Sequence, residues 1–315
     1  MKWTHRPGPC ESLAVALCAV LADRGVSVSY EQLVFELGLG MALTADPGRP
    51  VWQWAELARD AALVETAALH GLRVRDMHPP DAAVGLESSA EYPQHFEDSY
   101  RPLIRRALEY GQVVLAWGGW PPPAEHEWGV ICEQRGEALL GFVNGGDRRA
   151  VRHAGSSPQA YVVEDVVPAA PSAPDVIAHA VASTLRFWDG SLADSHGVQS
   201  GEEAYVRWIA TTRGAGPEAS VEPHYELCRR LGAARTSVSD ACELLGAGLD
   251  GAAARLARAW SRASLESSAA MTCQSAARGA PAARDLRELI ERVERGRTAE
   301  VEFLMSLRQF ARGAA

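Results

Sequence analysis

Apolar residues at helical spacing, with a glycine closing each run, dominate the first part of the chain. One such run predicts a helix over 10–24, which Gly25 ends. Its apolar face consists of Leu13, Leu17, Val20 and Leu21. Similar runs predict a second helix over 30–37 and a third over about 51–69. The chain is therefore expected to begin with consecutive amphipathic helices.

Strand-like runs follow these helices. A short run over 72–75 comes first, and a polar stretch with three prolines at 77–98 predicts an excursion over the surface. A further helix is expected over about 100–110. A turn at Gly136 predicts a hairpin between two of the later runs. These later expected strands cover 112–117, 128–132, 138–143 and 161–167.

The chain changes character after a stretch rich in proline, alanine and serine at 168–174, which we interpret as a linker. The longer apolar runs beyond it all have helical spacing. The pattern predicts an α+β domain over 1–168, followed by an all-helical domain over 175–315.

Composition narrows the functional classes. The chain of 315 residues is 47% hydrophobic and carries a formal net charge of −9, which argues against nucleic acid or an anionic membrane as a partner. We see neither a run long enough to span a membrane nor the apolar segment of a signal peptide. Six scattered cysteines, without the spacing of metal ligands, favour reduced thiols and a cytoplasmic protein with no metal or cofactor.

The first candidate for chemistry is Cys10, which follows Pro9 at the expected start of the first helix. The unpaired N–H groups and the dipole at a helix N-terminus stabilise a thiolate, so Cys10 is a candidate nucleophile. The alternative is that Cys10 is a small buried apolar residue. We interpret the other cysteines as core residues.

A nucleophilic cysteine needs an imidazole base, and the base needs an orienting group. His126 opens an expected strand after a proline-rich loop, although its position between two glutamates also suits an exposed histidine. Across the hairpin, Asn144 and Asp147 follow the partner strand, where either could reach His126. Each also suits a plain turn residue.

The order Cys10, His126, then Asn144 or Asp147 resembles the papain-like cysteine enzymes, in particular the bacterial branch related to bacteriocin-processing peptidases. The start Cys10-Glu11-Ser12 and the segment 201–209 resemble proteins grouped with the butirosin-biosynthesis acyltransferase. The likeness covers most of 5–167 in pattern and only a short motif in the helical half. It implies a papain-like fold, with N-terminal helices packed on an antiparallel sheet, and an appended helical domain.

The chain departs from this family at the oxyanion site. The family pattern has a glutamine about six residues before the cysteine, and the first thirty residues here contain none. Thr4 or His5 would have to replace that donor beside the Cys10 backbone N–H. Glu11 next to the thiol is a further candidate for this cleft. Trp120, near His126, is a candidate cleft wall, with core packing as its alternative.

These residues predict cysteine-dependent acyl transfer, in which Cys10 attacks a thioester or a peptide-like carbonyl and His126 moves the proton. Water as the acceptor would make the protein a peptidase or amidase, and an amine would make it an acyltransferase. The expected partners are a small-molecule or peptide acyl substrate and, for a thioester, an acyl carrier protein. The role of the helical domain, in shaping the cleft or in forming a homodimer, stays open. The alternative function is a catalytically inactive papain-like module that binds a peptide or a small metabolite.

Overall fold

The computed structural model describes residues 3–8, 10–45, 61–78, 89–144, 149–189, 199–214, 222–271 and 283–314. The chain forms two compact units, one from Met1–Tyr30 and Leu63–Ala170, the other from Glu31–Ala62 and Pro171–Ala315. The expected division was continuous in sequence. In the structure the segment from Glu31 groups with the helical half instead, so the first unit is built from two separate stretches of chain.

An antiparallel sheet of six strands forms the centre of the first unit, in the described part of the chain. In spatial order the strands are β2 (Leu72–Asp76), β7 (Gln159–Val166), β3 (Val113–Trp117), β4 (Trp128–Arg135), β5 (Ala138–Val143) and β6 (Val151–His153). The expected strands are all present, and β6 adds an edge strand that the sequence pattern did not indicate. Together with the helices, this sheet makes the protein an α+β protein.

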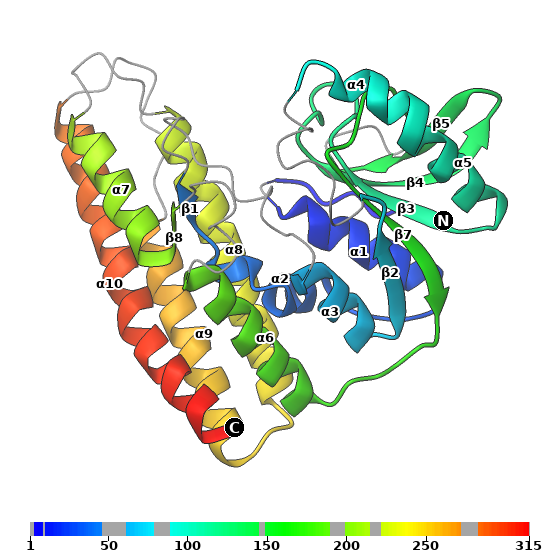
Figure 1. Ribbon diagram of the computed structural model, residues 1–315. Coiled ribbons are helices and arrows are strands. Elements are labelled where there is room, and N and C mark those ends of the chain that lie inside the picture. The colour runs from blue at the N-terminus through cyan, green and yellow to red at the C-terminus, as the bar shows by residue number, and fades with distance from the viewer. Residues whose placement is uncertain are drawn as a thin grey trace. The chain divides into compact units, whose positions relative to one another are not determined.

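Helices pack on both faces of the sheet (Figure 1). Helix α1 (Ser12–Asp23) lies on one face, and α4 (Tyr92–His95), a π-helical turn (Phe96–Tyr100) and α5 (Arg101–Glu109) lie on the other. The unit also contains Tyr30, the first residue of α2 (Tyr30–Glu36), and most of α3 (Ala61–Leu69).

The expected surface excursion at 77–98 is wrong for its last part, which is helical and places aromatic rings in the core. Tyr92, Phe96 and Tyr100 are spaced four residues apart, so all three rings fall on one helix face and pack into the core. The polar residues between them made the stretch look like a loop in the sequence. An aromatic residue on every turn is enough to anchor a short helical segment to a sheet.

Alternation along β3 separates the two faces of the sheet. Val114 and Ala116 join the core beneath α4 and α5, together with Ile131 of β4. Leu115 is also buried, and it therefore points to the opposite face, where α1 packs. A side chain in the middle of the sheet can thus be assigned to the α1 face or to the α4–α5 face by its register.

The second unit is helical apart from a two-stranded ribbon of β1 (Thr44–Ala45) and β8 (Gln199–Ser200). Its long helices α7, α9 and α10 run side by side (Figure 1). The helices of this unit after the linker are α6 (Ala173–Trp188), α7 (Gly201–Gly214), α8 (Glu222–Gly246), α9 (Gly251–Met271) and α10 (Ala283–Ala314). Within the described ranges, no helix combines the length and the apolar character that crossing a membrane requires.

Candidate active site

Cys10 lies just before α1 rather than on its first turn. The helix begins at Ser12, and Glu11 is its N-cap, with its carbonyl accepting the first helical hydrogen bond from Val15. Helix ends read from a sequence commonly differ from the structure by one or two residues. Cys10 precedes the first residue of the helix by two positions, so it lies near the helix N-terminus. It is half-buried and therefore partly accessible to solvent.

Asn144 is the residue that contacts the thiol. Its side-chain nitrogen Nδ2 donates to Cys10 Sγ over 3.0 Å, although the two residues are 134 positions apart in the chain. The same nitrogen donates to the Arg6 carbonyl oxygen over 2.9 Å, and the Arg6 backbone N–H donates to Asn144 Oδ1 over 2.8 Å. The amide is therefore held in one orientation by the backbone of Arg6, with an N–H directed at the sulfur.

The register of the sheet explains why Asn144 reaches the thiol. Trp117 of β3 pairs with Trp128 of β4, and Asn144 follows the β5 residue that pairs with Gly129. Cross-strand neighbours share a face, so Trp117, Trp128 and Asn144 form one row on the α1 face. The start of α1 is tied to this row, because Ser12 Oγ accepts from the Trp128 backbone N–H over 2.9 Å.

His126 is exposed and lies in the turn before β4. Its ring packs against the indole of Trp117, with 6.3 Å between the ring centroids and 30° between the planes. The predicted link from Asn144 to His126 is not among the contacts of Asn144, whose two N–H groups go to Arg6 and Cys10. His126 is nevertheless two residues before Trp128, which is tied to Ser12, two residues after Cys10. Cys10 and His126 thus each lie two residues before one end of the hydrogen bond between Ser12 and Trp128.

The segment before the thiol crosses the α1 face of the sheet. Trp3 stacks on Phe142 of β5, at 5.9 Å between centroids, and the Arg6 guanidinium lies 3.8 Å from the centre of the Tyr30 ring. Thr4 is exposed and His5 is half-buried. The oxyanion roles expected for Thr4 and His5 remain predictions.

A hydrogen bond joins Glu11, the residue after Cys10, to Tyr30. The Glu11 backbone N–H donates to the Tyr30 hydroxyl over 2.9 Å, and Glu11 is buried. Burial, and then the nearby carboxylate of Glu11, raise the pKa of the Tyr30 hydroxyl above its usual value. The tyrosine is therefore neutral at physiological pH. Its hydroxyl accepts the hydrogen bond from the Glu11 backbone N–H and adds no negative charge near a thiolate.

The expectation that Trp120 lines the cleft is wrong. Its side chain is 3% exposed and belongs to the core beneath α4 and α5, the opposite face from Cys10. The indole N–H donates to the Ala116 carbonyl over 3.2 Å, and the ring meets His153 edge-on at 4.9 Å. The glycines around Trp120 let the loop fold back over the sheet. The tryptophan that faces the candidate base is Trp117, for which core packing was expected.

The other described cysteines are either half-buried like Cys10 or buried. Cys18 and Cys132 are half-buried, and Cys228 and Cys242 are buried. Burial, the main cause in each case, raises the pKa of Cys132 and of Cys242. A raised pKa leaves these two thiols protonated and unreactive near neutrality. The remaining candidates, Asp147 and Cys273, lie outside the described residues, as do the tryptophans at 52 and 54.

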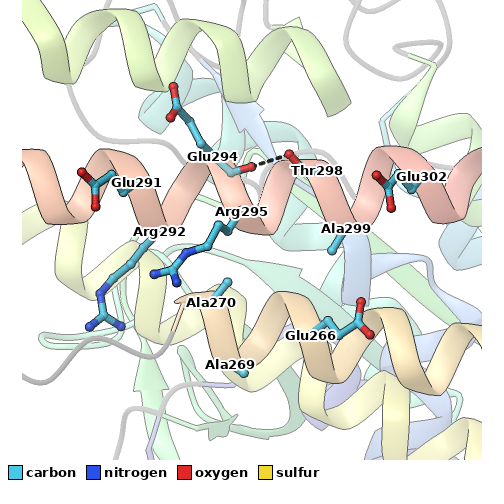
Figure 2. Close-up of a pocket in the computed structure, with 10 residues that line it drawn as sticks. All are labelled: Glu266, Ala269, Ala270, Glu291, Arg292, Glu294, Arg295, Thr298, Ala299 and Glu302. Atoms are coloured by element: carbon cyan, nitrogen blue, oxygen red, sulfur yellow. Dashed lines mark hydrogen bonds between the residues drawn. The ribbon is translucent and has the colours of Figure 1, made fainter.

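The second unit contains an open groove between α9 and α10, of about 1030 Å³. Figure 2 shows Glu266 of α9 and Arg295 of α10 among its lining residues, with the Thr298 hydroxyl donating to the Glu294 carbonyl. Its walls carry both carboxylates and guanidinium groups, and neither cysteine nor histidine is among the residues that line it. The candidate chemistry belongs to the first unit. No cluster that could hold a metal ion is found among the residues that the structure describes.

Sequence reasoning missed three residues of the site, namely Arg6, Ser12 and Tyr30. All three act through backbone atoms or through a single hydroxyl, for which the sequence has no motif. Trp117 was placed in the core because an isolated strand does not reveal which face is covered. No family model matches this chain, and no curated protein matches it either.

Proposed function

We propose that this protein is a papain-like cysteine enzyme that transfers an acyl group through Cys10. The observation that carries the proposal is the hydrogen bond from Asn144 Nδ2 to Cys10 Sγ. It joins two of the residues singled out for chemistry, on a half-buried thiol next to a helix N-terminus. A donor on the sulfur favours the thiolate, which is the nucleophilic form.

His126 is the proposed base. In the first step it accepts the Cys10 proton, Sγ forms a bond to the acyl carbon, and the carbonyl electrons move onto oxygen. Collapse of this intermediate breaks the bond to the leaving group, which takes the proton from His126. In the second step the acceptor bonds to the acyl carbon and gives a proton to His126, and the bond between Sγ and the acyl carbon breaks to release the Cys10 thiolate. The exposure of His126 suits a group that exchanges protons with substrate and solvent.

We infer that the acyl donor is a thioester and that the acceptor is an amine. A thiolate is a better leaving group than an amide nitrogen, so a thioester makes smaller demands on the protein. Water in place of the amine would make the protein a hydrolase. The proposal includes an acyl carrier protein as a source of the thioester. It also includes a cytoplasmic location, which the free thiols of Cys10, Cys18, Cys132, Cys228 and Cys242 support.

The test combines labelling with an acyl-donor panel. Wild-type protein is treated with iodoacetamide at neutral pH, and the labelled thiols are located by mass mapping. Cys10 is expected to react first, well ahead of Cys242. The protein is then incubated with acyl thioesters and peptides, and an acyl adduct that Cys10→Ala abolishes is expected. Labelling of Cys10 no faster than of the buried thiols would overturn the enzyme proposal.

One observation favours the second candidate, a binding module without catalysis. The contact seen for His126 is with the ring of Trp117 rather than with the thiol. A half-buried indole packed against an exposed imidazole would suit capture of a peptide or a small metabolite. This function predicts saturable binding of an acyl thioester or a peptide that Cys10→Ala leaves intact, and no covalent adduct.

A further inference from the structure

We infer that Asn144 is a catalytic residue that donates a hydrogen bond first to the Cys10 thiolate and then to the oxyanion of the acyl intermediate. This inference deepens the proposed acyl transfer and rests on it. It assigns Asn144 to the nucleophile side of the reaction instead of to the orientation of His126.

The first argument is the direction of the amide. An asparagine that orients an imidazole does so by accepting from it through Oδ1. Here Oδ1 accepts from the Arg6 backbone N–H at 2.8 Å, while Nδ2 donates to Cys10 Sγ at 3.0 Å. The second N–H of Nδ2 is bound to the Arg6 carbonyl. The amide cannot be flipped without placing oxygen against oxygen and N–H against N–H at Arg6.

The Asn144 amide is held in place before any reaction begins. Asn144 is only 6% exposed and directly follows β5, so its backbone is fixed by the sheet. Its side chain is fixed by two hydrogen bonds to one backbone residue. A donor held in this way needs no reorganisation when charge develops next to it, which is the property that makes an oxyanion donor effective.

The negative charge moves between two neighbouring atoms during the reaction. In the thiolate the negative charge is on Sγ. When Sγ bonds to the acyl carbon, the charge moves to the carbonyl oxygen, which is attached to that same carbon. The oxygen is then two bonds from the sulfur, so a donor within 3.0 Å of Sγ lies within reach of it. One N–H can therefore serve both states, and the charge returns to Sγ when the acceptor releases the enzyme.

Two substitutions distinguish a role of Asn144 as a donor to the thiolate from a role in orienting His126, namely Asn144→Asp and Asn144→Ala. Aspartate keeps the size and the acceptor of asparagine but presents a carboxylate to the sulfur, whereas alanine removes the donor to the sulfur together with both hydrogen bonds to Arg6. We expect the midpoint of the pH profile of Cys10 alkylation to rise by about one unit in Asn144→Ala and further in Asn144→Asp. In an orienting role, Asn144→Asp would retain the wild-type midpoint, because a carboxylate orients an imidazole well.

The oxyanion role has its own readout. Thioester turnover is measured above the alkylation midpoint of each variant, where the thiolate is fully formed in all of them. A loss of about 10²–10³ in kcat for Asn144→Ala under these conditions is expected for a missing oxyanion donor. A loss that disappears once the thiolate is formed would overturn the oxyanion part. The whole inference would be overturned if Asn144→Asp had a turnover within about threefold of wild type and an alkylation midpoint within about 0.3 pH units of it, which are about the limits of measurement.

The two proposals can fail separately. If wild-type Cys10 alkylates no faster than the buried thiols and turns nothing over, acyl transfer itself is wrong. If the wild type is active and the variants behave as an orienting group predicts, only this inference is wrong. Should neither variant fold, the Asn144 side-chain amide resonance of the wild-type protein replaces them. It must titrate with the alkylation midpoint and stay constant in Cys10→Ala, and a constant resonance in the wild type contradicts the donor role.

Discussion

The hydroxyl of Ser12 accepts a hydrogen bond from the backbone N–H of Trp128 over 2.9 Å. This hydrogen bond ties the first turn of α1 to the start of β4, two residues after the proposed nucleophile Cys10 and two residues after the proposed base His126. The acceptor is a buried side-chain hydroxyl, whereas most backbone N–H groups of a strand donate to carbonyls within the sheet. Here it brings two segments more than a hundred residues apart to the same place.

We expect Ser12→Ala to destabilise the first unit by about 1–3 kcal/mol, because it removes the buried hydroxyl that accepts from the Trp128 N–H. The measurement is hydrogen exchange at the Trp128 amide, which should lose protection by the corresponding factor. Ser99→Ala is the matched control, since the Ser99 hydroxyl is exposed, and it should change stability by less than about 0.5 kcal/mol. Unchanged protection of Trp128 in Ser12→Ala would contradict this role.

The buried His153 predicts a loss of stability in acid. Burial lowers the pKa of His153 to about 4, while its Nε2 contacts Ser157 Oγ at 2.8 Å. Between about pH 6.5 and pH 4 the unfolded chain binds a proton at this residue and the folded chain does not. The contribution is therefore complete above pH 6.5 and is lost as the pH falls to 4, by roughly 3 kcal/mol.

Urea unfolding of the first unit from pH 7 to pH 4 measures this loss. His153→Asn should flatten the acid dependence, whatever its effect on stability at pH 7. His126→Asn, which changes an exposed histidine, should leave the dependence as in the wild type. An acid dependence that persists in His153→Asn would show that other groups cause it.

Two glycines with the same backbone conformation allow a matched test of packing around this histidine. Gly119 has φ +77° and Gly111 has φ +72°, so alanine costs about 1–2 kcal/mol at either position. A Cβ at Gly119 would lie 2.3 Å from His153 Nε2, whereas a Cβ at Gly111 meets nothing within 4 Å. Gly119→Ala should therefore lose a further 1–3 kcal/mol or so. Equal losses in thermal unfolding of the two variants would show that the His153 pocket is not rigid.

The helical unit contains a fully buried ion pair. Arg235 Nε donates to Glu300 Oε1 over 2.8 Å, and neither side chain is exposed. Glu300 also accepts from the hydroxyls of Tyr205 and Ser267, at 2.9 and 2.6 Å. We expect Glu300→Gln to cost about 3–5 kcal/mol, because it leaves the Arg235 charge buried and unpaired.

Thermal unfolding checks this prediction, with Arg229→Ala as the control. Arg229 pairs with Glu226 on the surface of α8, and such pairs contribute less than about 1 kcal/mol. The double variant Arg235→Met/Glu300→Leu should be more stable than Glu300→Gln, because no unpaired charge remains. A double variant that is the least stable of the set would show that the network contributes more than charge compensation.

Local patterns in the sequence predicted most of the elements. Apolar repeats indicated the helices of the second half, and alternating runs indicated the main strands of the sheet, because both follow from local geometry. The same patterns missed the segment at 92–100, where a few buried aromatic residues anchor polar sequence to the core. They also assigned 31–62 to the first domain, because the group with which a helix packs is a long-range property.

The sequence by itself determined that Cys10 stands at a helix start and that His126 and Asn144 flank one hairpin. Only the tertiary structure decided which of them meet. The register of β3, β4 and β5 puts Asn144 on the α1 face, and the backbone of Arg6 turns its amide toward the sulfur. The same register puts Trp117 beside His126, while the loop after β3 carries Trp120 to the opposite face. Facing is set by pairing between distant strands, and no local pattern contains that information.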